Sequence, residues 1–264
     1  MWIENIVLGI TQGIAEWLPI SSEGLITLIK IKFFSDHHFF SIIKLALFLH
    51  LGTCFAAFIY FWKDVVSLSK TLFFYNAADE ENKKTLTFLI ISSTISCLLG
   101  LIIILLVSKI ANQMLLSGKI MTFGIGILLL ITAFLQLKTR KEGFKNVRDL
   151  RKIDAVVLGF VQGFAALPGL SRSGSTIATL LLRQFDKTTS LKLSFLMSLP
   201  VVLIGNIFLG IKHFEFTFES LAGFFFSFAF GLLTIHILFK IANKINFGYF
   251  VLGFGILTII SVFI

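Results

Sequence analysis

Charged residues are scarce in this sequence: Asp, Glu, Lys and Arg make up 14% of the 264 residues, whereas 56% are hydrophobic. A soluble domain could not bury that much apolar surface. The composition therefore excludes a water-soluble globular protein and predicts an all-α polytopic membrane protein. Cysteine is much scarcer, with two residues in the whole chain. Cys54 and Cys97 both lie in apolar runs, which favours packing residues over a disulfide or a metal site.

The first ten residues show no charged n-region followed by a small-residue cleavage site, so we expect no cleavable signal. The net charge of +9 comes from basic residues in short segments between apolar runs, not from one basic face, which argues against nucleic-acid binding. The most basic segment is 138–152. By the positive-inside rule we expect this linker to be cytoplasmic and the protein to lie in the cell membrane.

Two interrupted apolar segments resemble each other. GITQGIAEWLPISSEGLI covers 9–26, and GFVQGFAALPGLSRSGSTI covers 159–177. A shift of 150 residues superposes Val7, Leu8, Gly9, Gln12, Gly13, Ala15, Ser21 and Gly24 on Val157, Leu158, Gly159, Gln162, Gly163, Ala165, Ser171 and Gly174. The pairs Leu18-Pro19 and Leu167-Pro168 correspond one position out of step.

This similarity predicts one membrane domain built from two repeats, 1–137 and 153–264, joined by the linker 138–152. Apolar segments broken by Gly and Pro at corresponding places indicate a binding site near the bilayer midplane. We expect six full spans in addition to the two interrupted segments. Whether the interrupted segments cross the bilayer or form re-entrant hairpins stays open, because non-helical backbone is tolerated wherever it lines a cavity.

The second interrupted segment carries Arg172, flanked by Ser171 and Ser173. An intramembrane arginine costs about 2.5–3.5 kcal/mol even on the lenient insertion scales, so it should face a partner or a water-filled cavity. A helix that begins here exposes free N–H groups, and hydroxyls and a guanidinium add donors, which together favour a phosphate ligand. The alternative is an N-capping serine and a purely structural ion pair of Arg172.

The first interrupted segment adds a carboxylate, Glu16, six residues before Ser22. A carboxylate in a dry cavity can take the proton of a serine nucleophile. Glu16 could instead bind a divalent cation, magnesium or calcium, that shields phosphate charge. A third interpretation is a buried Glu16–Arg172 ion pair without chemistry.

GITQGIAEWLPISSEG and DAVVLGFVQGFAALPGLSRSGSTI resemble the two signature loops of the bacitracin-resistance family of undecaprenyl-diphosphate phosphatases. The resemblance implies two inverted repeats with two re-entrant loops, and removal of the terminal phosphate of a polyprenyl diphosphate. It implies Ser22 as the nucleophile, Glu16 as the second glutamate of the acidic motif, and Arg172 with Ser171 and Ser173 as the diphosphate clamp. We count as further substrate-binding candidates Gln12, Ser21, Glu23, Gly24 and Gly174.

The first loop departs from the family pattern. Gln12 stands at the usual first glutamate, Glu23 at the usual threonine and Leu25 at the usual histidine. Gln12 cannot act as a base, and Leu25 can neither transfer a proton nor bind a metal. One hypothesis is that Glu23 replaces the missing carboxylate as base or metal ligand. The alternative is a first-turn glutamate that interacts with the helix dipole.

These departures leave a second function open, a lipid-phosphate transporter or flippase, or a binding protein that kept the clamp and lost catalysis. Two histidines in apolar spans, His50 and His236, are candidates for the site, although a hydrogen-bonded interior histidine is the simpler interpretation. The expected partners are the polyprenyl diphosphate and the bilayer, with a homodimer as one option for assembly.

Overall fold

The computed structural model describes residues 2–34, 39–114, 118–138, 143–167, 169–210, 217–241 and 247–263. Pro168, part of the expected Leu-Pro pair, and residues 139–142 of the basic linker lie outside these ranges. In chain order the elements are α1 (Trp2–Ala15), α2 (Ser22–Phe33), α3 (Phe39–Tyr60), α4 (Trp62–Phe73), η1 (Tyr75–Ala77), α5 (Glu80–Met114), α6 (Gly118–Leu137), η2 (Val147–Asp149), α7 (Lys152–Phe164), α8 (Arg172–Leu182), α9 (Lys187–Gly205), the π-helical turn η3 (Asn206–Gly210), α10 (Phe218–Ile241) and α11 (Phe247–Ile260).

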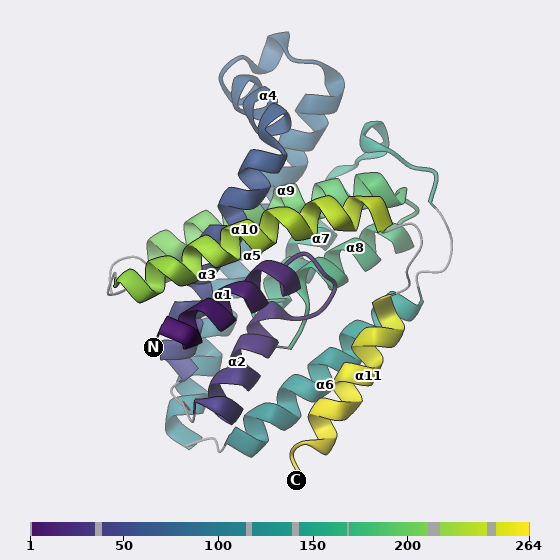
Figure 1. Cartoon of the computed structure of the whole chain (residues 1–264). Helices are drawn as coiled ribbons and strands as arrows, with labels where there is room; N and C mark the ends of the chain where they lie inside the picture. The colour runs from purple at the N-terminus through teal and green to yellow at the C-terminus, as the bar shows by residue number, and fades with distance from the viewer. Residues whose placement is uncertain are drawn as a thin grey trace.

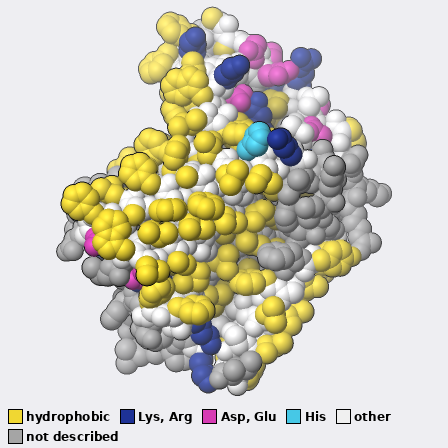
Figure 2. All heavy atoms as spheres, viewed as in Figure 1, with side chains coloured by type: hydrophobic (Ala, Val, Ile, Leu, Met, Phe, Trp, Pro, Cys, Tyr) yellow, Lys and Arg dark blue, Asp and Glu magenta, His cyan; other side chains and the backbone are white. Residues whose placement is uncertain are grey.

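The regular elements of the described chain are all helices, apart from one isolated bridge between Lys145 and Phe185, and several helices have the length and apolarity of membrane spans. Three qualify, within Glu80–Val107, Lys187–Phe208 and Phe218–Lys240. Hydrophobic side chains cover the middle of the molecule, whereas charged side chains gather mainly at the end where α4 projects (Figures 1 and 2). We conclude that this is a multi-pass membrane protein.

The expected number of six full spans is not confirmed among the described residues. A fourth span exists if α3 and α4 are counted as one, but these helices are bent by 86° at their junction. The apolar parts of α6 and α11 are shorter than a full span, and the two helices pack against each other (Figure 1).

Glycine pairs bring each interrupted segment close to a long helix. In α1, a Cβ at Gly9 would lie 2.3 Å from the Gly223 oxygen, and one at Gly13 would lie 2.8 Å from the Ser227 oxygen, both in α10. In α7, Gly159 and Gly163 approach α5 in the same way. Glycines four residues apart let helix backbones approach closely in a membrane. The repeated Gly-x-x-x-Gly therefore fixes the packing of α1 on α10 and of α7 on α5.

Both interrupted segments are helix–loop–helix units whose loops meet inside the bundle. Ser21 caps α2: its Oγ accepts from the N–H of Gly24 at 3.1 Å and from the N–H of Gly169, in the other loop, at 3.0 Å. Ser171 caps α8: its Oγ accepts from the N–H of Gly174 and donates to the Ile20 carbonyl, each at 3.1 Å. Each capping serine thus also joins the two loops.

Candidate active site

A cavity of about 430 Å³ lies where the two loops meet. The loops and the first turns of α2 and α8 form its polar end, which includes Glu16, Ser22 and Arg172. The rest of its wall comes from α3, α5, the end of α7 and α9–η3. This size suits a small headgroup with part of a chain attached.

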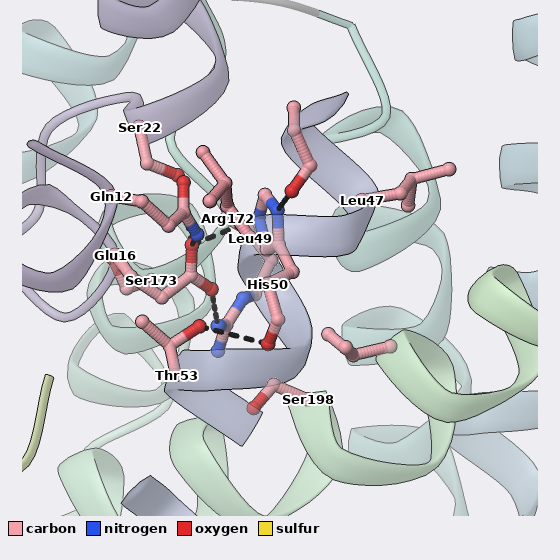
Figure 3. A network of polar contacts seen from close by, with 12 residues as sticks. Gln12, Glu16, Ser22, Leu47, Leu49, His50, Thr53, Arg172, Ser173 and Ser198 are labelled. Carbon is pink, nitrogen blue, oxygen red and sulfur yellow. Dashed lines mark hydrogen bonds and ion pairs between the residues drawn. The ribbon is translucent and has the colours of Figure 1, made fainter. Parts of the chain in front are cut away.

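Glu16 is the centre of the polar end. Its Oε2 accepts from Gln12 Nε2 at 2.9 Å and from Ser22 Oγ at 2.8 Å, and it lies 2.9 Å from His50 Nε2 (Figure 3). Its Oε1 pairs with the guanidinium of Arg172. The Glu16 side chain is only 4% exposed, so these partners replace its hydration. The first interrupted segment therefore supplies a negative charge, and the second a positive charge, to one buried site.

Arg172, the first residue of α8, is positioned by three contacts. Besides its pair with Glu16, it donates from NH1 to the Ser194 carbonyl of α9 at 3.1 Å. Its Cζ lies 5.6 Å from the ring centroid of Trp17, within the range of a cation–π contact. The guanidinium has five N–H donors. Only two of them have partners among the described residues, and the side chain borders the cavity.

The serines on either side of Arg172 make hydrogen bonds within the protein. The Ser171 hydroxyl is used by the α8 cap and by Ile20, and Ser173 Oγ donates to the Leu18 carbonyl at 2.8 Å while bordering the cavity. Gly174 packs against Pro19: a Cβ there would lie 3.1 Å from its carbonyl oxygen. Ser21, Gly24, Ser171 and Gly174 thus hold the loops together, and a direct contact with substrate stays a prediction for them.

The glutamines at corresponding positions of the two repeats, Gln12 and Gln162, have different hydrogen-bond partners. Gln12 holds Glu16, whereas Gln162 donates from Nε2 to Ser96 Oγ and to the Met197 carbonyl, each at 3.1 Å. Ala166 stands where the second repeat would need a counterpart of Glu16. The two capping serines, Ser21 and Ser171, both have extended backbone angles, but only the first interrupted segment carries the Glu16 carboxylate and only the second carries an arginine.

The family model described as bacitracin resistance protein BacA matches residues 5–260. The chain belongs to this family. Among curated BacA-like relatives, an undecaprenyl-diphosphatase of Methanococcoides burtonii is 41% identical over 99% of this chain and 98% of its own length. Proteins with the same name from Haloarcula marismortui and Korarchaeum cryptofilum are 33% and 32% identical, each over 97% of this chain. The resemblance to the bacitracin-resistance family is therefore confirmed.

The structure also places Glu23 and Leu25, which together with Gln12 are the positions at which this BacA-family chain departs from the pattern. Glu23 lies in the first turn of α2 and lines the cavity, and its side chain makes no hydrogen bond within the described part of the chain. Leu25 packs against an apolar cluster that includes Ile125 and Leu129 of α6. Among the described residues, no group of three or more His, Cys, Asp or Glu is arranged to hold a metal ion.

His50 is a residue of the cavity for which the sequence favoured a hydrogen-bonded interior histidine over a site residue. It lies in the middle of α3, an apolar helix, and its side chain is 9% exposed. Its Nδ1 lies 2.6 Å from the Ala46 carbonyl, and its Nε2 faces Glu16 (Figure 3). The other candidate, His236, is exposed on α10 and does not line the cavity.

Proposed function

We propose that this protein is a polyprenyl diphosphate phosphatase that releases the terminal phosphate and leaves the lipid monophosphate. One observation carries the proposal: the Ser22 hydroxyl donates to the Glu16 carboxylate at 2.8 Å in the wall of a cavity that Arg172 also borders. A nucleophile within hydrogen-bond reach of a base, beside a phosphate-binding cation, is the arrangement that covalent phosphoryl transfer requires. The names of the curated relatives support the same substrate class.

The chemistry follows from the contacts of these three residues. Ser22 Oγ attacks the terminal phosphorus and passes its proton to Glu16 Oε2. The bond from phosphorus to the bridging oxygen breaks, and its electron pair stays on the leaving lipid phosphate. Arg172 stabilises the charge that develops on the phosphoryl oxygens through its unused N–H groups. A water oxygen then bonds to the phosphorus of the phosphoserine and the bond from phosphorus to Ser22 Oγ breaks. Glu16 returns its proton to Ser22 Oγ, and both protons of the water leave with the released phosphate.

The finer architecture belongs to the same proposal. Two inverted repeats with re-entrant loops account for the matched packing of α1 on α10 and α7 on α5, and for the reciprocal serine caps. The basic linker 138–152 is placed in the cytoplasm, and the protein in the cell membrane. A homodimer stays a prediction.

The isoprenoid chain is assigned to the apolar part of the cavity, a slot between α5 and α9–η3. Leu98, Leu101 and Ile104 form one side, and Val202, Ile204 and Phe208 form the other. Leu98 and Phe208 are 62% and 73% exposed, so the slot reaches the outer surface of the bundle. Between residues 98 and 104 α5 rises by roughly 9 Å, enough for the first part of a chain. This geometry supports lateral entry of a lipid.

Phosphate release from undecaprenyl diphosphate by purified protein in detergent tests the function, and Gly205→Leu tests the slot. Gly205 lines the cavity, and a Cβ there would meet only Leu47, at 3.7 Å, so a larger side chain enters the slot without displacing backbone. Losing contact with two CH₂ groups lowers affinity about tenfold. We expect that loss for undecaprenyl diphosphate and none for isopentenyl diphosphate, which has no long chain.

Gly253→Leu is the matched control, because Gly253 in α11 has open space around its Cβ position and lies outside the cavity. Equal turnover of both substrates in the Gly205 and Gly253 variants would place the chain elsewhere. Absence of phosphate release from folded parent protein, together with movement of lipid phosphate across a vesicle membrane, would instead favour the transporter. Membership of the BacA family supports the enzyme and gives the transporter or binding protein no support.

Glu23 is the carboxylate of the cavity that is available to a divalent cation. Magnesium is commonly held by one or two carboxylates together with substrate phosphates, and there it neutralises phosphate charge. The Glu16 oxygens are already occupied by protein donors. We expect Glu23→Gln to abolish any stimulation of phosphate release by magnesium or calcium and to weaken binding of the cation, measured by calorimetry with the diphosphate present. Unchanged turnover and unchanged metal dependence would leave Glu23 with a role only at the helix dipole.

A further inference from the structure

His50 and Glu16 hold one proton between them. The Ala46 carbonyl can only accept, so His50 Nδ1, at 2.6 Å, must carry a hydrogen. His50 Nε2 lies 2.9 Å from Glu16 Oε2, a distance at which two lone pairs would repel each other. A hydrogen therefore lies between Nε2 and Oε2, and the pair carries one proton more than a neutral imidazole beside a carboxylate.

The surrounding donors place that proton on the histidine. Glu16 also accepts from Gln12 and Ser22 and pairs with Arg172, all of which favour an ionised carboxylate. Among the described residues, the other titratable or charged groups around the pair are Glu23 of α2 and Cys97 of α5, both in the wall of the same cavity, and the buried Cys54 of α3. A second carboxylate near the site also favours an imidazolium.

We infer that His50 is a positioning residue of the reaction. Its imidazolium holds the Glu16 carboxylate in place, and the shared proton stays on His50, so that Glu16 remains ionised. This inference rests on the proposed phosphatase. With the proton on Nε2, the lone pair of Glu16 Oε2 that accepts from Ser22 Oγ can take the proton that leaves Ser22 as Oγ bonds to phosphorus. If His50 loses its proton, its Nε2 lone pair faces the carboxylate and the alignment with Ser22 is lost. The histidine comes from α3, on the cavity side, whereas Leu25 faces α6.

Nitrogen-15 NMR of the His50 ring tests the protonation directly, without any dependence on turnover. In the parent protein at neutral pH we expect a hydrogen on both ring nitrogens. In Glu16→Gln we expect the hydrogen on Nε2 to be lost, because the carboxylate that favours it is gone. The spectrum of His50→Gln assigns the signals. An unprotonated Nε2 in the parent protein would overturn the inference, even if the protein proves to be a phosphatase.

The pH profile of phosphate release tests the role in the reaction. His50→Gln keeps an N–H donor toward Glu16 but carries no titrating charge, so we expect kcat to fall about 10²-fold at neutral pH with little change in KM. We also expect the alkaline limb of the parent profile to move to higher pH or disappear. His236→Gln, on the exposed face of α10, should leave both kcat and the alkaline limb of the profile unchanged. If His50→Gln lowers the rate by the same factor at every pH and keeps the alkaline limb of the parent protein, the role of His50 is purely structural.

The two experiments separate the inference from the function on which it rests. A doubly protonated His50 ring in a protein that releases no phosphate would refute the phosphatase, and the protonation assigned to His50 would stand. Phosphate release by a protein whose His50 Nε2 is unprotonated would support the phosphatase and refute the assigned protonation.

Discussion

Replacing Ser22 by alanine is expected to lower phosphate release by about 10⁴-fold or more, because the substitution removes the atom that attacks phosphorus. The effect on stability should be small. Glu16 keeps its contacts with Gln12, His50 and Arg172 when the Ser22 donor is lost. One hydrogen bond of this kind contributes about 1–2 kcal/mol. A large kinetic loss in a protein that unfolds near the parent temperature would therefore identify a group in the reaction and not a structural one.

Ser21→Ala is the matched control for Ser22→Ala. Ser21 Oγ caps α2 and accepts from Gly169 in the other loop, so its removal should cost about 1–2 kcal/mol of stability and much less activity. Acid quenching with a substrate labelled at the terminal phosphate adds a direct readout. Label should remain on the parent protein, at Ser22, and be absent from Ser22→Ala. Retained turnover in Ser22→Ala would assign the attack to another nucleophile, such as water.

The helical membrane fold and the two loops could be predicted because their signals are local. Scarce charge together with long apolar runs predicts membrane helices, and the Gly-x-x-x-Gly pairs with the Leu-Pro pairs mark both interrupted segments. The pairing of Glu16 with Arg172 is also predictable, because each charge needs a partner in an apolar bundle, and the structure contains that pair. The number of spans is less predictable, because the apolar stretches of α6 and α11 are shorter than a full span within the described residues.

The role of His50 could not be predicted from its sequence neighbourhood. Its apolar helix gives no sign of what the ring faces, and its partner Glu16 lies on a different segment. Ser171 shows the opposite difficulty. Its Ser-Arg-Ser setting indicates a phosphate donor, yet the hydroxyl is used by the α8 cap and by Ile20. Which hydroxyls stay free depends on how the two loops pack against each other. This packing of distant segments cannot be predicted from the sequence of either loop alone.

Replacing Arg172 is the second change with a large expected effect. An arginine aimed at a transferred phosphoryl group contributes about 10³–10⁵ in rate, so Arg172→Ala should lose that much activity. The alanine variant also leaves Glu16 without its guanidinium, and breaking a buried pair costs about 3–5 kcal/mol. Arg172→Lys is therefore the more informative variant. It keeps the charge but loses the planar fork, and we expect kcat to fall by roughly 10²–10³-fold.

Arg183→Lys provides the control for Arg172→Lys, because both arginines belong to one helical segment and both pair with a buried carboxylate. Arg183 follows the end of α8, outside the cavity, and pairs with Asp154 of α7, whose side chain is 3% exposed. If the guanidinium of Arg172 acts on phosphate, the two variants should unfold at similar temperatures, while only Arg172→Lys loses kcat. Equal kinetic losses in both would mean that the rigidity of α8 limits turnover. A full rate in Arg172→Lys would reduce the role of the residue to that of a point charge beside Glu16.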